Sequence, residues 1–208
     1  SAASDVYKRQ VTAGVWGGDE INVVTGHNSV ESQTLQTQKL NNNTAVMDNT
    51  IDIASVGGMY AGKITLVAND TDAGIKNFGN INASGSGITL ASDGKLAQHG
   101  KLAAQKGSIS ITAGGDIYNS QQILAGTDLQ LQTEGKLLSI GTIGSETGII
   151  TLSAAKDFTQ TGSVRLEKGA LNINVGSDLY QYGNISVQQG RTSLLVQGNS
   201  GQYGTISS

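Results

Sequence analysis

Apolar residues recur along most of this chain at intervals of 20 or 21 residues. Within residues 107–126 they alternate with polar residues and stand at Ile109, Ile111, Ile117 and Ile123. Alternation with a period of two is typical of strands, so this segment predicts two short strands separated by a turn at Gly115 and by a corner. Because the pattern then repeats, we expect a stack of similar coils.

Four apolar columns follow from this spacing, where a column means the residues at one position of successive coils. The first column contains Ile64, Ile88, Ile109, Leu129, Ile150, Leu171 and Thr192, and the second lies two residues later in each coil. The third contains Ile75, Leu96, Ile117, Leu137, Phe158, Leu179 and Ser200, and the fourth lies six residues after it. Seven coils are thus in register, with an outward bulge expected near residues 69–74.

These columns predict an all-β protein, a right-handed parallel β-helix whose coils contain about 20–21 residues. No segment sustains the i, i+3, i+4 spacing of an amphipathic helix. An antiparallel sandwich would change its pattern from strand to strand, whereas here the same kind of side chain returns at the same place in each coil. The chain contains no Pro, which suits central strands because their N–H groups are needed for pairing.

The spacing divides the chain into three parts. Residues 1–10 match none of it, and we expect a non-native leader there. Residues 11–62 predict the end of a secretion-domain-like β-helix, interrupted by a polar loop at about residues 32–49. Residues 63–208 predict the repeated β-helix. Trp16 follows an apolar stretch, and we expect its side chain to pack in the core.

Composition narrows the class of protein. The chain has 29 Gly, no Cys and 4% aromatic residues, so its interior must be narrow and it forms no disulfide. A net charge of -3, spread along the chain, argues against a nucleic-acid-binding surface. No apolar run approaches the roughly 20 residues that a transmembrane helix needs.

One column of charged and polar residues precedes the third apolar column. It contains Lys95, Asp116, Lys136, Asp157, Asp178 and Asn199. Opposite charges in neighbouring coils would attract and help to set the register, at about 0–1 kcal/mol for each exposed pair. The glycines before this column, at positions 94, 115, 135 and 198, are expected to adopt positive φ angles in a turn.

The same acidic residues are the candidates for chemistry. Asp116, Asp157 and Asp178 could serve a polysaccharide lyase or hydrolase, which needs clustered carboxylates. We favour a structural role, because Lys136 interrupts the column and no second acidic column faces it. His27 and His99 lie in distant coils and offer no pair of metal ligands. We therefore expect no catalytic site, no metal or cofactor, and no enzyme activity.

Three tyrosines form the candidate ligand-binding surface. Tyr182 and Tyr203 are 21 residues apart and should stack on adjacent coils, with Tyr180 nearby. Exposed aromatic rings can dock sugar rings, although a stacked pair also arises as a simple contact between strands. Both interpretations stay open.

Three segments carry a family resemblance. They read VWGGDEINVVTGHNSV, IDIASVGGMYAGKITLV and GNINASGSGITLASDGKLAQHGKLAAQ, and GGMYAGKI is the most specific part. They resemble the filamentous haemagglutinin and contact-dependent inhibition exoproteins of Gram-negative bacteria, over residues 11–208. The resemblance looks like the end of a two-partner secretion domain followed by haemagglutinin repeats. It implies export through an outer-membrane Omp85-type transporter and a β-helical fibre at the outer-membrane surface.

The leading hypothesis is a structural fibre segment of a large secreted exoprotein, acting in adhesion or as the stalk for a toxin. The family's upstream secretion motif contains Pro and this chain has none, so we expect an internal fragment of a longer parent. The implied partners are the parent's transporter and a receptor or glycan on a host or neighbouring cell. Strand edges at both ends of such a fragment predict end-to-end self-association. A carbohydrate-binding module and a polysaccharide lyase are the alternatives.

Overall fold

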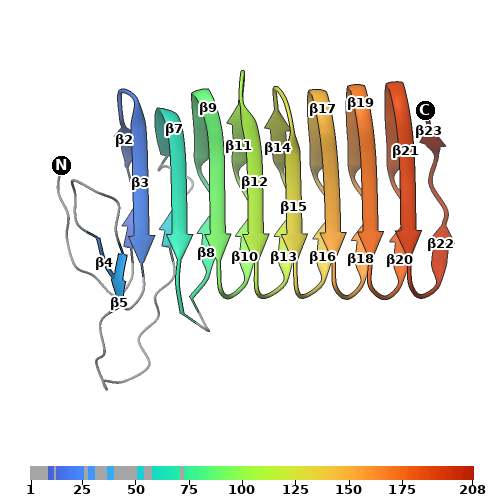
Figure 1. The fold of residues 1–208 in the computed structure, drawn as a ribbon, viewed down its shortest axis with the longest axis horizontal. Helices are drawn as coiled ribbons and strands as arrows, with labels where there is room; N and C mark the ends of the chain where they lie inside the picture. Colours follow the sequence, from blue (N-terminus) through green and yellow to red (C-terminus); the bar gives the residue numbers. More distant parts are fainter. Residues whose placement is uncertain are drawn as a thin grey trace.

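The computed structural model describes residues 9–11, 13–25, 28–30, 37–39, 51–53, 58–70 and 73–208. Within these ranges the chain consists of strands and turns wound into coils, which stack along the axis that lies horizontally in Figure 1. Successive coils pair through parallel strands, as between residues 150–154 and 171–175, one coil of 21 residues later. The predicted parallel β-solenoid is therefore confirmed.

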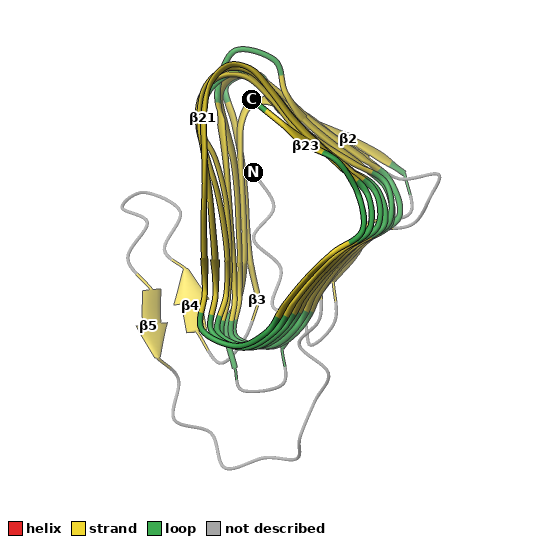
Figure 2. Cartoon of the chain, turned by 90° about the vertical axis from the view of Figure 1, so that its right-hand side faces the viewer, coloured by secondary structure: helices red, strands yellow, loops and turns green. Residues whose placement is uncertain are grey.

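The coils are three-sided, as the view along the axis in Figure 2 shows. One side is a nine-stranded sheet, and the other two sides share a twelve-stranded sheet. They share it because the longest strands bend round the corner between them: residues 80–83 of β9 (Asn80–Ser92) pair with β11 (Lys101–Ala104), and residues 87–92 pair with β12 (Ser108–Ala113).

The remaining strands occupy equivalent places in successive coils. The nine-stranded sheet consists of β1 (Arg9–Val11), β6 (Ile51–Ile53), β8 (Ile75–Asn77), β10 (Leu96–Gln98), β13 (Ile117–Asn119), β16 (Leu137–Ser139), β18 (Phe158–Gln160), β20 (Leu179–Gln181) and β22 (Ser200–Gln202). The twelve-stranded sheet adds β2 (Gly14–Trp16), β3 (Glu20–Thr25), β7 (Gly58–Ala68), β14 (Gln122–Ala125), β15 (Leu129–Thr133), β17 (Thr142–Ala154), β19 (Ser163–Val175), β21 (Asn184–Val196) and β23 (Ile206–Ser207).

The strand register confirms all four apolar columns. Each predicted neighbour is the observed partner, as for Ile64 with Ile88 and for Phe158 with Leu179. The columns line a single core that runs the length of the solenoid, and most of their side chains are fully buried. They also begin one coil earlier than predicted, since Ile21 pairs with Ile64. The sequence hid this coil because an insertion separates the two residues.

The coils have one more corner than predicted, and buried polar side chains form it. Where two strands per coil were expected, the core carries an amide column at the end of the nine-stranded sheet, every member of which is at most 1% exposed: Asn77, Gln98, Asn119, Ser139, Gln160 and Gln181. Asn77 Oδ1 accepts a hydrogen bond from the Gly79 backbone N–H (3.0 Å), and Gln98 Nε2 donates to the Gly100 carbonyl (2.7 Å). These bonds close the bend, as side-chain turns of Asn do.

The amide column also joins neighbouring coils. Asn77 Nδ2 donates to Gln98 Oε1 at 2.8 Å, and Asn119 Nδ2 donates to Ser139 Oγ at 3.2 Å. Buried amides are tolerated in a protein core when they are hydrogen-bonded. The column therefore fixes both the bend within a coil and the contact between coils.

The glycines of the predicted turn have a different role from the expected one. Those at positions 94, 115, 135 and 198 do not have positive φ angles; Gly148 is one of four glycines that do (φ 93°), and these lie at the corner within the long strands. A Cβ atom at Gly135 would overlap the Asp116 carboxylate of the preceding coil. The turn thus uses glycine because neighbouring coils approach closely there.

The insertions lie mostly where the sequence places them. The extra residues between Ile64 and Ile88 lie between the end of β7 at Ala68 and the start of β8 at Ile75, as predicted. Within the predicted polar loop, β5 (Thr37–Lys39) pairs with β4 (Asn28–Val30) as an antiparallel hairpin. Residues 9–11 pair with β6, and the proposed division of the chain at residues 10 and 62 stays a prediction. No helix in the described ranges is long and apolar enough to cross a bilayer.

Candidate functional site

The structure brings the three predicted tyrosines together at one corner of the solenoid. Tyr182 and Tyr203 follow β20 and β22, and their rings stack as predicted, with centroids 5.0 Å apart and planes 8° apart. Their residues are 50% and 72% exposed. Tyr180 lies on β20, and its hydroxyl donates to Asp178 Oδ2 at 3.2 Å. The negative charge of Asp178 raises the pKa of Tyr180 above its ordinary value of 10.0, because it disfavours the phenolate.

A second aromatic cluster, missed by the sequence analysis, occupies the same corner near the other end of the array. Phe78 stacks on His99 with ring centroids 4.7 Å apart, and Tyr118 meets His99 edge-on at 5.1 Å. His99 Nδ1 is also hydrogen-bonded to Ser120 Oγ at 2.9 Å. The 21-residue spacing between Phe78 and His99 was the signal that could have revealed this cluster. His27, the other candidate metal ligand, lies outside the described residues.

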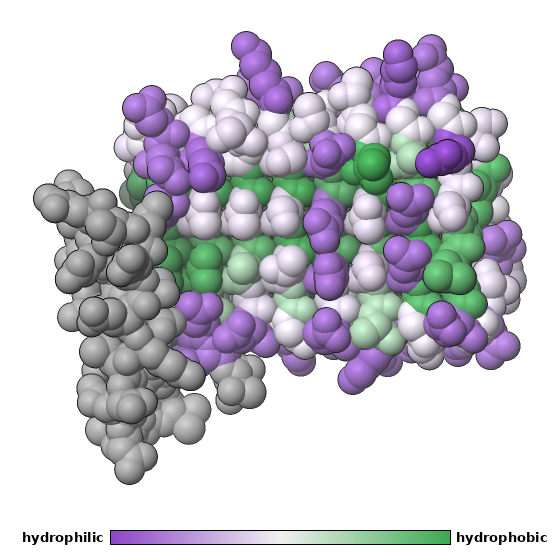
Figure 3. Space-filling view, in the orientation of Figure 1, coloured by the Kyte–Doolittle hydropathy of each residue, from purple (hydrophilic) through white to green (hydrophobic). Residues whose placement is uncertain are grey.

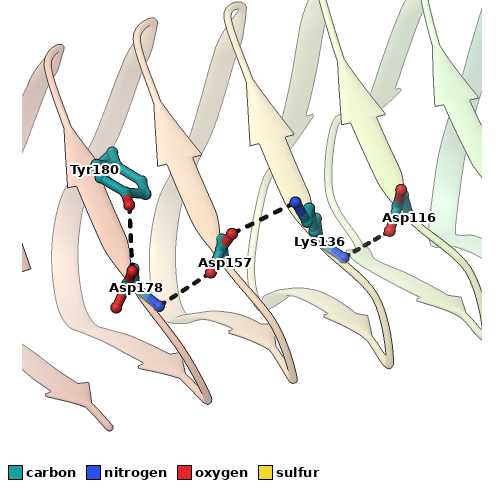
Figure 4. Close-up of polar contacts among 5 residues, drawn as sticks. All are labelled: Asp116, Lys136, Asp157, Asp178 and Tyr180. Carbon is teal, nitrogen blue, oxygen red and sulfur yellow. Dashed lines mark hydrogen bonds and ion pairs between the residues drawn. The ribbon is translucent and has the colours of Figure 1, made fainter. Parts of the chain in front are cut away.

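The predicted charged column lies at the turn between the long strands and the nine-stranded sheet (Figure 4). We name Asp116, Lys136, Asp157, Asp178 and Asn199 the carboxylate column. Asp116 Oδ1 accepts the backbone N–H of Lys136 at 2.8 Å, and Asp178 Oδ1 accepts that of Asn199 at 2.8 Å. Each carboxylate thus binds the backbone of the next coil, a contact that the sequence did not reveal.

Asp157 makes both kinds of contact in this column. Its Oδ1 accepts the backbone N–H of Asp178 at 3.2 Å, and its Oδ2 lies 3.5 Å from Lys136 Nζ, which is one of the predicted ion pairs. The Asp178 N–H holds the pKa of the Asp157 carboxyl below its ordinary value of 3.8, with smaller contributions from the Ser177 side chain and the Lys136 charge. Both oxygens of Asp157 therefore serve contacts between coils.

The broad face of the long strands carries no comparable cluster in the part of the chain that is described. Its central outward column consists of small and amide residues: Thr65, Thr89, Ser110, Gln130, Thr151, Asn172 and Ser193. In Figure 3 the hydrophilic side chains of this face are spread among near-neutral ones. No group of three or more His, Cys, Asp or Glu side chains in the described ranges could hold a metal ion.

The prediction for Trp16 is wrong. Its residue is 78% exposed, and its ring stacks on Tyr60 with centroids 4.2 Å apart and planes 18° apart. The cause is its phase in strand β2: Trp16 pairs with Tyr60, which pairs with Asn82, and this column points outward. Beside it lies a groove with a volume of about 290 Å³.

Comparison with known proteins finds similarity to CdiA proteins. A segment of 110 residues, 50% of this chain, is 36% identical to "Toxin CdiA" of Yersinia pestis, and it covers 3% of that protein. A segment of 80 residues (38% of the chain) is 35% identical to "tRNA nuclease CdiA-2" of Burkholderia pseudomallei and covers 3% of it. A segment of 63 residues (30% of the chain) is 41% identical to "16S rRNA endonuclease CdiA" of Enterobacter cloacae and covers 2% of it.

No family model matches the chain, and no solved structure matches it significantly. The chain spans only 2–3% of the length of the curated relatives it matches. Their names nevertheless correct one expectation: we predicted no enzyme activity, whereas relatives are named as nucleases. That prediction rested on the side chains of a few coils, which carry no information about the rest of so long a protein. Over half its length, this chain is similar to contact-dependent inhibition proteins of the CdiA type.

Proposed function

We propose that this chain is a segment of the fibre of a contact-dependent inhibition exoprotein, whose complete form delivers a nuclease toxin to a neighbouring cell. One observation carries the proposal: the register of the first apolar column continues unbroken through seven coils, from Ile64 to Thr192. Coils that contact only their neighbours extend a protein along one axis, which is what a stalk requires. The names of the relatives favour toxin delivery over adhesion.

The proposal includes a place and partners for the complete protein. It would leave the cell by two-partner secretion through an Omp85-type transporter and stand at the outer-membrane surface of a Gram-negative bacterium. Its coils would belong to the haemagglutinin-repeat type. RNA enters as the substrate of the complete protein, in line with the tRNA and 16S rRNA in the relatives' names. The low charge of the coils bears only on their own surface.

A growth competition between cells that make the complete exoprotein and a susceptible strain tests this proposal. Deleting residues 150–170 removes one whole coil and lets Leu171 take the place of its partner Ile150, so inhibition should persist. Deleting residues 150–159 removes about half a coil and puts the apolar columns out of register, so inhibition should fall to background. No inhibition by the intact protein, or equal inhibition by both deletions, would contradict the proposal.

The exposed Tyr182–Tyr203 stack favours a second candidate function, carbohydrate binding. The flat faces of aromatic rings at a solvent-exposed corner can pack against the apolar face of a sugar. A glycan array probed with the whole chain and with a Tyr182→Ala, Tyr203→Ala double variant tests it. Tyr118→Ala, in the other aromatic cluster, is the matched control. Binding that survives the double variant would exclude this surface.

A further inference from the structure

The only tryptophan of the chain has no role in the core. Trp16 lies on β2, 78% exposed, and its column of three outward residues continues through Tyr60 to Asn82. Tyr60 supports one face of the indole, at a centroid distance of 4.2 Å. Exposing so large an apolar ring costs hydrophobic free energy that burial would recover. Such a ring, held in a fixed orientation, is suited to contact a ligand.

The groove beside Trp16 has an apolar floor and a polar rim. Small residues give it depth: Ala61 and Ala83 are buried beneath it, and Gly17 and Gly18 contribute no side chain. The rim carries Asn82, Ser84 and Gln105. No hydrogen bond to another described residue engages the side-chain amides of Asn82 and Gln105. These amides are therefore available to a ligand, each with two N–H donors and one acceptor oxygen.

The composition of this groove selects the class of ligand. Its nine lining residues are Trp16, Gly17, Gly18, Tyr60, Ala61, Asn82, Ala83, Ser84 and Gln105, and none of them carries a charge. A neutral ligand is therefore complementary, since nothing in the groove would replace the hydration of a charged one. The volume of about 290 Å³ lies at the lower end of the roughly 300–1,000 Å³ of typical ligand sites, so it suits a single ring.

We propose that this groove binds one neutral hexopyranose ring, with its apolar face on Trp16 and its hydroxyl groups on Asn82 and Gln105. Adjacent hydroxyl groups both donate and accept hydrogen bonds, which is the pattern that a primary amide matches. The site differs from the tyrosine surface, because it lies on the twelve-stranded sheet in the first coils. It also stands independently of the toxin-delivery proposal.

Trp16 fluorescence reports directly on this site, because the chain has no other tryptophan. The whole chain is titrated with glucose, galactose, mannose and N-acetylglucosamine, each to about 50 mM, a range that covers millimolar dissociation constants. At least one of these sugars should produce a saturable change in emission, and glucuronate should produce none. No saturable response to any neutral sugar, or an equal response to glucuronate, would overturn the proposal.

Three variants locate the bound ring. A Cβ atom at Gly18 would meet no other atom within 4 Å, so Gly18→Val fills the groove without a clash and should weaken binding at least tenfold. Asn82→Ala and Gln105→Ala should each weaken it about fivefold, the effect of losing one hydrogen bond of about 1 kcal/mol. Tyr203→Ala, on the other corner, should leave it unchanged. Binding that all three groove variants retain, with wild-type circular dichroism, would contradict this assignment.

Discussion

The amide column and the carboxylate column lie at two corners of the same coils and repeat at the same spacing. The amides are buried, at most 1% exposed, whereas Asp116 and Asn199 are exposed to solvent. In both columns a side chain of one coil is hydrogen-bonded to the next coil, as Asn77 is to Gln98 and Asp116 is to the Lys136 backbone. The two columns thus make similar bonds in opposite environments.

The difference teaches which polar contacts a solenoid depends on. Water can replace a bond lost from the carboxylate column, so each of those bonds contributes little net free energy. Water cannot reach the amide column without opening the core, so a donor that loses its acceptor there stays unpaired. We therefore expect the amide column to control stability and the carboxylate column to adjust the alignment of coils.

The largest effect should follow from Gln98→Leu. The substitution leaves Asn77 Nδ2 without its acceptor and the Gly100 carbonyl without its donor, both inside the core. The free energy of unfolding in urea should fall by about 1–3 kcal/mol. Gln98→Asn is the matched control, because Asn occupies the same column at positions 77 and 119, and it should cost less. Equal losses for both variants would show that the amide itself is unimportant.

A double variant sharpens this test. Adding Asn77→Leu to Gln98→Leu removes the Nδ2 group that the single substitution leaves unpaired. The combined loss should therefore be smaller than the sum of the two single losses, by about 1 kcal/mol. Strict additivity would indicate that the two amides act independently.

A smaller effect is expected for Asp116→Ala. The variant removes the acceptor of the Lys136 backbone N–H, but this group can then bind water. The free energy of unfolding should fall by about 0.5–1 kcal/mol, and Asp116→Asn, which keeps an acceptor oxygen, should lose less. A loss as large as that of Gln98→Leu would remove the distinction between the two columns.

The carboxylate column should also give stability a dependence on pH. The pKa of Asp157 in the folded chain lies below 3.8, its ordinary value, because the Asp178 N–H favours the carboxylate. Its contribution is complete above that ordinary value and is lost as the pH falls through the folded pKa. Urea unfolding at about pH 6 and about pH 3 should show a smaller pH-dependent loss in Asp157→Asn than in the unchanged chain. An identical loss would exclude this contribution.

The smallest effect should be that of Lys136→Met. The ion pair with Asp157 is 3.5 Å long, and the Lys136 side chain is 61% exposed. Removing it should lower the free energy of unfolding by about 0.5 kcal/mol or less, and about 1 M salt should abolish the difference. A loss above about 1 kcal/mol that persists in salt would mean that packing of the lysine stem dominates.

The sequence predicts the solenoid well because its apolar columns follow from alternation and a constant repeat. Ile109 and Ile111 indicate a buried face without knowledge of any other coil, and their partners follow by counting residues. The amide column escaped prediction because Asn119 and Gln98 resemble turn residues at the surface. Their burial arises only when the coil closes around them.

The binding surfaces were less predictable, for a related reason. Tyr182 and Tyr203 could be paired by their spacing alone, whereas the orientation of Trp16 depends on its phase in a coil interrupted by an insertion. The contact of Asp116 with the Lys136 backbone was invisible too, because a sequence shows which side chains are neighbours but not which atoms meet.

The length of the solenoid provides the most direct test of the central claim, that each repeat of 21 residues adds one coil to a rod of constant section. Four extra copies of residues 150–170 are inserted after Ala170, and small-angle X-ray scattering is extrapolated to zero concentration. Because neighbouring strands lie about 4.8 Å apart, the rod should lengthen by about 19 Å while its cross-sectional radius of gyration stays the same. A wider cross-section, or an unchanged length, would contradict the account.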